Sequence, residues 1–120
     1  MTLKIAIIGA GMAGITAART LVQAGHRVHI FEKSRSAAGR MSTRETVFGT
    51  FDHGTQYFTV RDPRFSLALQ TVAGTKEICR PWSASAVRVL DPMGQVFEAA
   101  KQNHDAHFVA SPGMNALVRH

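Results

Sequence analysis

The chain has 120 residues, of which 45% are hydrophobic and 18% are charged, and it carries a formal net charge of +6 at neutral pH. This length and composition predict one globular domain that buries roughly two-thirds of its unfolded surface, and they exclude a disordered chain. The single cysteine, Cys79, excludes an internal disulfide and indicates a reduced, cytoplasmic setting.

The first predicted elements are a strand, a glycine turn, a helix and a second strand. The first strand covers residues 5–8, and apolar residues at helical spacing follow the turn until Gly25 ends the helix. The second strand starts at residue 27 and ends in a carboxylate, Glu32. The turn contains three glycines at the G-x-G-x-x-G spacing, which are Gly9, Gly11 and Gly14. This order is the layout of a dinucleotide-binding βαβ unit.

Each glycine has a physical role in such a unit. Gly9 lets the chain reverse, Gly11 lacks the Cβ that would block a pyrophosphate, and Gly14 lets the helix approach the strand. The N–H groups at the helix start then face the phosphates. Glu32 is placed to accept both hydroxyls of an adenosine ribose, and its charge disfavours the 2′-phosphate of NADP despite the adjacent Lys33. A βαβ turn without a ligand is the alternative interpretation.

A basic run follows the second strand. Four cations lie within twelve positions, namely Lys33, Arg35, Arg40 and Arg44. We interpret them as counter-charges to a pyrophosphate. A nucleic-acid patch is the alternative, but no nucleic-acid motif or interleaved aromatic accompanies the run, so we expect no nucleic-acid partner. The apolar run at residues 5–18 imitates a signal peptide, yet it is too short to span a bilayer, so we expect no membrane partner.

The middle of the chain is predicted to alternate between loops and short elements. We predict a loop over residues 34–40, a short apolar segment at 47–54 that ends in a glycine turn, and an extended run at 56–60. Asp62 is predicted to cap a helix that begins at Pro63 and runs up to Gly74.

The last third of the chain is predicted to be rich in strands. Two strands at residues 84–90 and 95–98 flank a turn and form a hairpin. A strand at 106–110 then precedes a final helix, with Ser111 as its cap and Pro112 at its first position. Because that helix pattern stops at the last residue without a stop signal, we expect the chain to be cut within the helix.

These elements together predict an α/β fold. It is a Rossmann-like FAD/NAD(P)-binding fold with a β-rich insert, truncated at the C-terminus. We expect residues 1–60 to form the dinucleotide-binding core and residues 61–104 a helix plus a β-rich insert on the substrate side. Residues 105–120 begin the return to the nucleotide-binding domain.

A second motif follows the fingerprint, made of Ala38, Gly39, Arg40, Met41 and Thr43. With the glycine turn and the ribose carboxylate, it resembles the flavoprotein amine oxidase superfamily. Residues 51–65 narrow this resemblance to the renalase-like branch of FAD-dependent oxidoreductases, and residues 111–117 are similar to a fourth segment of those proteins. The resemblance covers essentially the whole chain and implies FAD rather than NAD.

The resemblance also implies a set of cofactor-binding residues. The ADP half of FAD is expected to meet Gly9, Gly11, Ala13, Gly14, Glu32, Lys33 and Arg40, and the isoalloxazine ring is expected to meet Gln56 and Tyr57. The planar guanidinium of Arg40 suits a diphosphate better than an ammonium group does. Ala38 stands where many family members have a glycine. This replacement has a mild effect on stability if the φ of residue 38 is negative and a costly one otherwise. Family members are also considerably longer than this chain.

Other chemical constellations are weaker. His104, Asp105 and His107 could supply metal ligands, but such residues in a polar turn are usually solvated, so we predict no metal. Asp52 and His53 imitate an acid/base pair, yet adjacent strand residues point to opposite faces, and we expect Asp52 to fix the turn at Gly54.

Two further assignments concern the aromatic run. By spacing alone Gln56 and Tyr57 would be core residues, but the resemblance implies that they approach the isoalloxazine ring. Phe58 stays in the predicted core. No catalytic residue can be named.

The sequence therefore predicts an FAD-binding oxidoreductase. Its flavin accepts a hydride equivalent from a small-molecule donor, a dihydronicotinamide or an amine, with a complementing C-terminal chain as a partner. A truncated, non-catalytic fragment that binds FAD or ADP is one alternative. A Rossmann-type NAD-binding module is the other.

Overall fold

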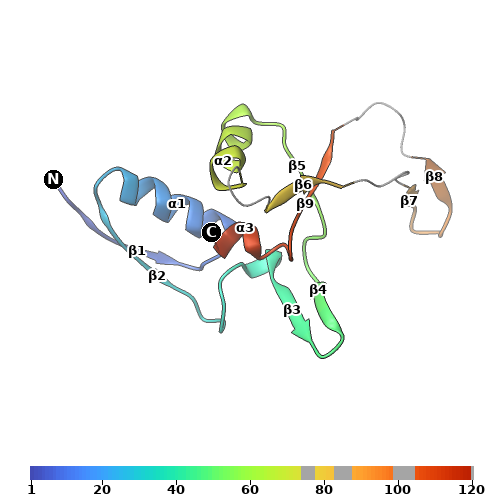
Figure 1. Ribbon diagram of the computed structural model, residues 1–120, viewed down its shortest axis with the longest axis horizontal. Helices are drawn as coiled ribbons and strands as arrows, with labels where there is room; N and C mark the ends of the chain where they lie inside the picture. Colours follow the sequence, from blue (N-terminus) through green and yellow to red (C-terminus); the bar gives the residue numbers. More distant parts are fainter. Residues whose placement is uncertain (74–77, 83–87, 99–104, 120) are drawn as a thin grey trace.

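A parallel βαβ unit forms one end of the molecule, and a small antiparallel sheet with a helix forms its middle (Figure 1). These features come from a computed structural model that describes residues 1–73, 78–82, 88–98 and 105–119. The helical elements are α1 (Met12–Gln23), α2 (Pro63–Ala73), α3 (Ala116–Arg119) and a 3-10 turn, η1 (Gly39–Met41). The strands are β1 (Lys4–Ile8), β2 (Arg27–Phe31), β3 (Thr43–Thr46), β4 (Gly49–Asp52), β5 (Phe58–Thr59), β6 (Cys79–Pro81), β7 (Arg88–Leu90), β8 (Val96–Glu98) and β9 (His107–Ala110).

The βαβ unit matches the sequence prediction closely. β1 and β2 are parallel neighbours, paired along their whole length, and α1 connects them. The helix ends in a Schellman-type cap, because Gly25 adopts a φ of 85° and the N–H groups of Gly25 and His26 donate to the carbonyls of Val22 and Leu21. The predicted strand, helix and glycine stop are therefore confirmed.

The hairpin β3–β4 was not predicted from the sequence. It closes with Thr46 opposite Gly49, which leaves Val47 and Phe48 as a two-residue loop. Such loops usually hold Asn, Asp or Gly, so the sequence carries no hairpin signal at this position. Val47 and Phe48 are 95% and 90% exposed, so the tip of the hairpin presents apolar side chains to solvent.

The antiparallel sheet has β9 at its centre, with β5 on one side and β6 on the other. Phe58 of β5 stacks on Phe108 of β9, with ring centroids 6.0 Å apart, and its ring lies 5.9 Å from Phe65 of α2. α2 therefore covers one face of this sheet, and Phe58 is half-buried there as predicted. Asp62 caps the helix, because its carboxylate accepts the N–H of Arg64 at 2.8 Å.

The last helix begins later than the sequence predicts. α3 starts at Ala116, so Ser111 is not its cap and Pro112 is not its first residue. The N–H of Ser111 instead donates to the carbonyl of Ile78 at 2.7 Å, which extends the pairing of β6 with β9. This long-range hydrogen bond holds residue 111 at the sheet, and a cap signal in the local sequence does not reveal it.

Asp52 has a different role from the one predicted. Its Oδ1 accepts the hydroxyl of Thr43 at 2.6 Å and the N–H of Met114 at 2.9 Å, and Thr43 in turn accepts the N–H of Asn115 at 3.2 Å. These bonds join the hairpin β3–β4 to the segment that leads into α3. Asp52 therefore caps that segment and does not fix the turn at Gly54.

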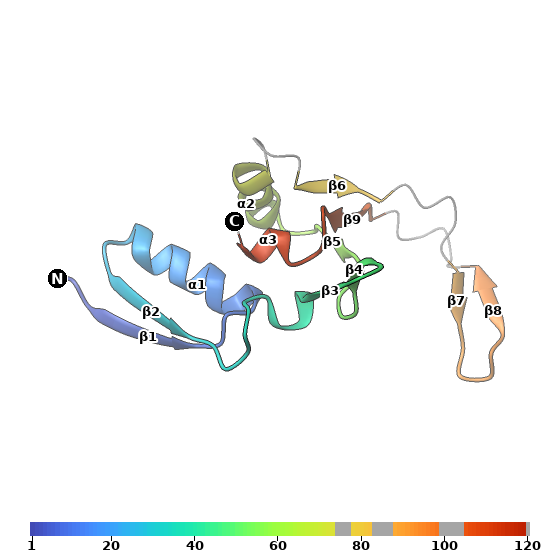
Figure 2. The same cartoon turned by 60° about the horizontal axis from the view of Figure 1, so that its bottom comes forward.

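The hairpin β7–β8 lies at the far end of the molecule from the βαβ unit (Figure 2). Asp91 organises its turn, since its Oδ1 accepts the N–H groups of Met93 and Gln95 at 2.9 and 2.8 Å. The predicted hairpin is confirmed for the described residues. The first part of its predicted first strand, residues 84–87, lies outside them.

The core lies between α2, α3 and the antiparallel sheet. Its buried residues are Ala38, Met41, Leu69, Ile78, Ala110, Met114, Ala116, Leu117 and Val118. The radius of gyration is 17.1 Å, whereas a compact domain of this length has about 14 Å. Ile8 and Phe31 on the parallel strands stay 83% and 57% exposed, so the chain alone leaves apolar surface uncovered. Among the described residues, no helix is long and apolar enough to cross a membrane.

Candidate functional site

The glycine turn after β1 has the shape expected for close approach of a ligand. Gly9 adopts a φ of 98°, which favours glycine, and its N–H donates to the carbonyl of Phe31 at 2.7 Å. A Cβ on Gly14 would collide with the carbonyl oxygen of Gly9, so only glycine lets α1 start this near the strand. A Cβ on Gly11 would meet nothing within 4 Å, so it would point into open space beside the turn.

The start of α1 offers free donors at that open space. Gly11 is the N-cap and provides no side-chain hydrogen bond, and the first turn contains no acidic residue. Within the described part of the chain, the N–H groups of Ala13 and Gly14 have no acceptor. A twelve-residue helix with uncapped N–H groups has a positive end that favours an anion.

Glu32 lies against the glycine turn. Its Oε2 accepts the N–H of Ala10 at 2.7 Å, and its Oε1 accepts the N–H of Ser34 at 2.8 Å. These hydrogen bonds, with that of Ala10 the strongest, hold the pKa of Glu32 below its usual value. Each carboxylate oxygen retains a further lone pair, so the side chain can still accept two ribose hydroxyls. The adjacent Lys33 is exposed, and its ammonium group has no ion-pair partner in the described residues.

The 3-10 turn η1 brings the second motif to the first. A Cβ on Gly39 would lie 3.5 Å from the Cα of Gly11, so the two glycine segments touch. Arg40 follows, with an exposed side chain that has no partner among the described residues. Its carbonyl accepts the N–H of Thr55 at 2.9 Å, and a Cβ on Gly54 would strike that carbonyl. The backbone of Arg40 is therefore fixed one residue beyond the contact with the glycine turn, and its side chain is exposed.

Ala38 carries backbone strain at the same junction. It adopts a φ of 112° and is only 1% exposed, and its N–H donates to the carbonyl of Ala10 at 2.9 Å. A positive φ is unfavourable for a residue with a Cβ. Alanine in place of glycine at this position therefore costs stability, because φ is positive and not negative.

Gln56 and Tyr57 lie directly after Thr55 and are both exposed. Tyr57 belongs to an aromatic cluster that the sequence did not predict. Its ring centroid lies 4.5 Å from that of His107 and 5.9 Å from that of Trp82. Only the strand register brings these three residues together, so no local signal could have identified Trp82 and His107.

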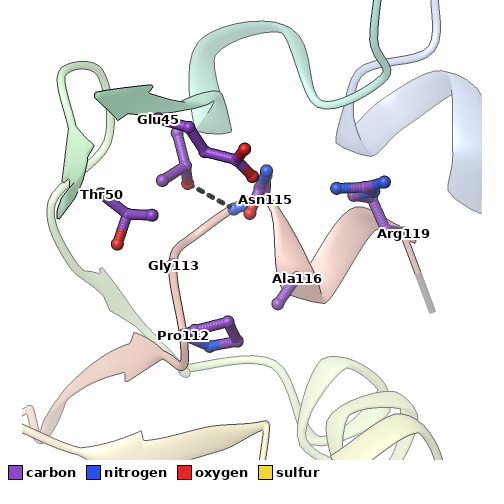
Figure 3. Close-up of a pocket in the computed structure, with 8 residues that line it drawn as sticks. Glu45, Thr50, Pro112, Gly113, Asn115, Ala116 and Arg119 are labelled. Carbon is purple, nitrogen blue, oxygen red and sulfur yellow. Dashed lines mark hydrogen bonds between the residues drawn. The ribbon is translucent and has the colours of Figure 1, made fainter. Parts of the chain in front are cut away.

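A cavity of about 330 Å³ lies between the hairpin β3–β4 and the start of α3. Figure 3 shows Glu45 and Thr50 of the hairpin facing the segment that contains Asn115, with the Thr43–Asn115 hydrogen bond between them. The full lining is Thr43, Glu45, Thr50, Pro112, Gly113, Asn115, Ala116 and Arg119. None of these residues was a predicted site residue.

The alternative constellations find little support in the geometry. Asp52 bonds Thr43, whereas His53 Nδ1 lies 3.1 Å from the carbonyl of Ser42, so the two side chains do not form an acid/base pair. Cys79 is a half-buried free thiol, and burial raises its pKa. The described residues contain no cluster of three or more metal-ligating side chains, and His104 lies outside them.

Comparison with known proteins adds three findings. A family model described as an NAD(P)-binding Rossmann-like domain matches residues 7–71, more than half of the chain. The 4,4'-diapophytoene desaturase (4,4'-diaponeurosporene-forming) of Staphylococcus aureus strain Newman is 46% identical over 52 residues, which are 43% of this chain and 10% of that protein. The same enzyme of strain USA300 matches equally. The chain thus spans a small fraction of these curated relatives.

Solved structures share the fold. A redesigned double mutant of putrescine oxidase superposes with a TM-score of 0.56 at 24% identity, covering 86% of this chain and 23% of that one. A fatty acid isomerase from P. acnes gives a TM-score of 0.55 at 24% identity, covering 83% and 23%. These likenesses and the family match confirm the predicted Rossmann-like α/β fold.

Proposed function

We propose that this chain, which belongs to the NAD(P)-binding Rossmann-like domain family, binds FAD and forms the nucleotide-binding portion of an oxidoreductase. The observation that carries this proposal is the junction of two glycine segments, where the N–H of Ala38 donates to the carbonyl of Ala10 at 2.9 Å and a Cβ on Gly39 would lie 3.5 Å from the Cα of Gly11. Arg40 follows Gly39 directly and is exposed, and the start of α1 is uncapped, which supports a site where both could meet one anion.

The residues present fit an adenosine diphosphate. The diphosphate would meet Gly11 with the N–H groups of Ala13 and Gly14, and the guanidinium of Arg40 offers a bidentate fork. The carboxylate of Glu32, whose pKa is lowered by the N–H groups of Ala10 and Ser34, would accept the ribose hydroxyls. It would also repel a 2′-phosphate, which disfavours NADP.

The resemblance of the second motif and of residues 51–65 to the flavoprotein amine oxidase superfamily supports FAD over NAD. Thr55 is held by the carbonyl of Arg40, so Gln56 and Tyr57 continue from the diphosphate end of the site toward the antiparallel sheet. A bound flavin supplies an acceptor for a hydride equivalent. The chain's own residues bind and orient it, and Tyr57 with Gln56 would adjoin the ring.

The renalase-like specificity belongs to this proposal too. The resemblance over residues 51–65 supports a dihydronicotinamide donor, and an amine is the alternative within the superfamily. The desaturase and the putrescine oxidase similarities support only the wider group of oxidoreductases. Anaerobic bleaching of bound flavin by a reduced nicotinamide, but not by putrescine, would support the first donor class, and the reverse would contradict it.

The proposal also divides the chain into three functional parts. We propose that residues 1–60 hold the nucleotide, residues 61–104 form the substrate side, and residues 105–120 return toward the nucleotide domain. The exposed apolar side chains of Ile8 and Phe31 on a two-stranded sheet support a complementing polypeptide that covers them. A cytoplasmic location remains part of the proposal.

Calorimetric titration with ADP tests the nucleotide site. We expect Arg40→Ala and Glu32→Gln each to weaken binding by about ten-fold, because each removes a charged hydrogen-bonding group. Arg88→Ala is the matched control, since Arg88 lies on the distant hairpin β7–β8 (Figure 2). Unchanged affinity in both site variants would contradict the proposal. Tighter binding of NAD than of FAD would instead support an NAD-binding module.

A further inference from the structure

The antiparallel sheet has one face that the described residues cover only in part. α2 packs on the face that carries Phe58 and Phe108. Because side chains alternate between the faces of a strand, Tyr57 and His107 lie on the opposite face. Tyr57 and Trp82 are 44% and 47% exposed there, so this face carries aromatic rings in contact with solvent.

The register of the strands explains why these rings meet. Pro81 is paired with Phe108, so Trp82 stands opposite His107, and the N–H of Trp82 donates to the carbonyl of His107 at 2.7 Å. Directly paired residues of antiparallel strands share a face, and diagonal neighbours remain within reach of aromatic side chains. His107 therefore belongs to β9, whereas Tyr57 directly precedes β5 and Trp82 directly follows β6.

The rings form a platform rather than a filled core. Tyr57 and Trp82 are stacked with an interplanar angle of 28°, and His107 meets Tyr57 edge-on at 74°. The 5.9 Å between the centroids of Tyr57 and Trp82 leaves no room for a ring between them. A planar ligand would thus lie on their exposed faces, as bases lie on aromatic side chains in single-strand binding sites.

The charges on this face indicate the rest of the ligand. Arg80 is paired with Val109 and lies on the same face as Trp82, with an exposed side chain and no ion-pair partner in the described residues. Arg61 is neutralised by Asp105, whose carboxylate lies 2.6 Å from its Nε. Arg80 is therefore the cation available to an anionic group carried by a stacked ring.

We propose that Tyr57, Trp82 and His107, with Arg80, form the site that takes the planar heteroaromatic ring and anionic arm of the substrate. The proposal rests on the proposed function, because Tyr57 connects this face to the nucleotide site through Gln56 and Thr55. It assigns specificity to Trp82 and His107, which the cofactor site does not use. An apolar partner segment fits this face less well, because a histidine and a free arginine stand among the rings.

Trp82 is the only tryptophan of the chain, so its fluorescence reports directly on the site. We would titrate the full chain with nicotinamide mononucleotide, which has a planar pyridinium ring and a phosphate. Saturable quenching is expected, with binding about ten-fold weaker in His107→Leu, as loss of one stacking or edge contact predicts. Arg80→Gln is expected to weaken the mononucleotide but not nicotinamide riboside, which lacks the phosphate.

Phe48→Ala is the control, because Phe48 is an exposed aromatic on the distant tip of β3–β4 and should leave the titration unchanged. Retained urea unfolding and ADP binding in each variant show that the variant is folded. Three results would overturn the site: no saturable quenching, quenching unaffected by both His107→Leu and Arg80→Gln, or equal quenching by putrescine. FAD binding without any mononucleotide response would sink this inference and leave the proposed function standing.

Discussion

Replacing Ala38 by glycine is expected to stabilise the fold. Ala38 has a φ of 112°, a conformation that glycine adopts without a Cβ penalty. Relief of such strain is worth about 1 to 3 kcal/mol. Two terms oppose it, which are the loss of a buried methyl group, about 0.8 kcal/mol, and the extra freedom of glycine in the unfolded chain, about 0.5 kcal/mol. The net expectation is a gain of about 1 kcal/mol.

Urea unfolding of the wild type and of Ala38→Gly measures this difference. A gain of about 1 kcal/mol corresponds to a rise of about 4 °C in Tm for a domain of this size. Ala37→Gly is the matched control, because Ala37 is the neighbouring alanine and is not among the residues with positive φ. It should lose stability. The strain argument would be refuted if Ala38→Gly were no more stable than the wild type while Ala37→Gly behaved as expected.

Three further predictions follow from single contacts. Asp52→Ala should destabilise the fold by about 1 to 3 kcal/mol because the N–H of Met114 loses its acceptor, whereas Asp52→Asn, which keeps an oxygen there, should lose less in the same urea experiment. The pKa of Asp62 is lowered to about 2, mainly by the side chain of Arg64, so the stability that the ionised carboxylate contributes is complete above the unfolded pKa of 3.8 and is lost as the pH falls toward 2. In Asp62→Asn the urea midpoint should therefore change less with pH between 3.8 and 2. A pH profile equal to that of the wild type would contradict this role of Asp62. Gly14→Ala should abolish folding or displace α1, seen as lost helical circular dichroism, since its Cβ would collide with the carbonyl of Gly9.

Local sequence patterns predicted the elements whose signals are local. The βαβ unit, its Gly25 stop and the Asp62 cap of α2 each depend on residues a few positions apart. Residues close in the sequence are enough to form these elements, so the tertiary contacts leave them as predicted. The fold class could therefore be predicted before any contact was known.

Long-range contacts decided the parts that were missed. Ser111 imitates a helix cap, but its N–H is bound to Ile78, and Asp52 supplies the acceptor further along. The hairpin β3–β4 has an apolar two-residue loop, and its turn is held by the hydroxyl of Thr46, which accepts the N–H of Phe48 and donates to the carbonyl of Gly49, in addition to the strand pairing. Trp82 and His107 meet only through the antiparallel pairing of β6 with β9, which a sequence without contacts does not give.

Titration of the purified chain with FAD and with NAD in one calorimetric series distinguishes an FAD site from an NAD site. We expect saturable FAD binding that is tighter than NAD binding and is weakened by Arg40→Ala but not by Arg88→Ala. FAD binding that is absent, weaker than NAD binding, or indifferent to Arg40→Ala would contradict the claim that the two glycine segments and Arg40 form an FAD site.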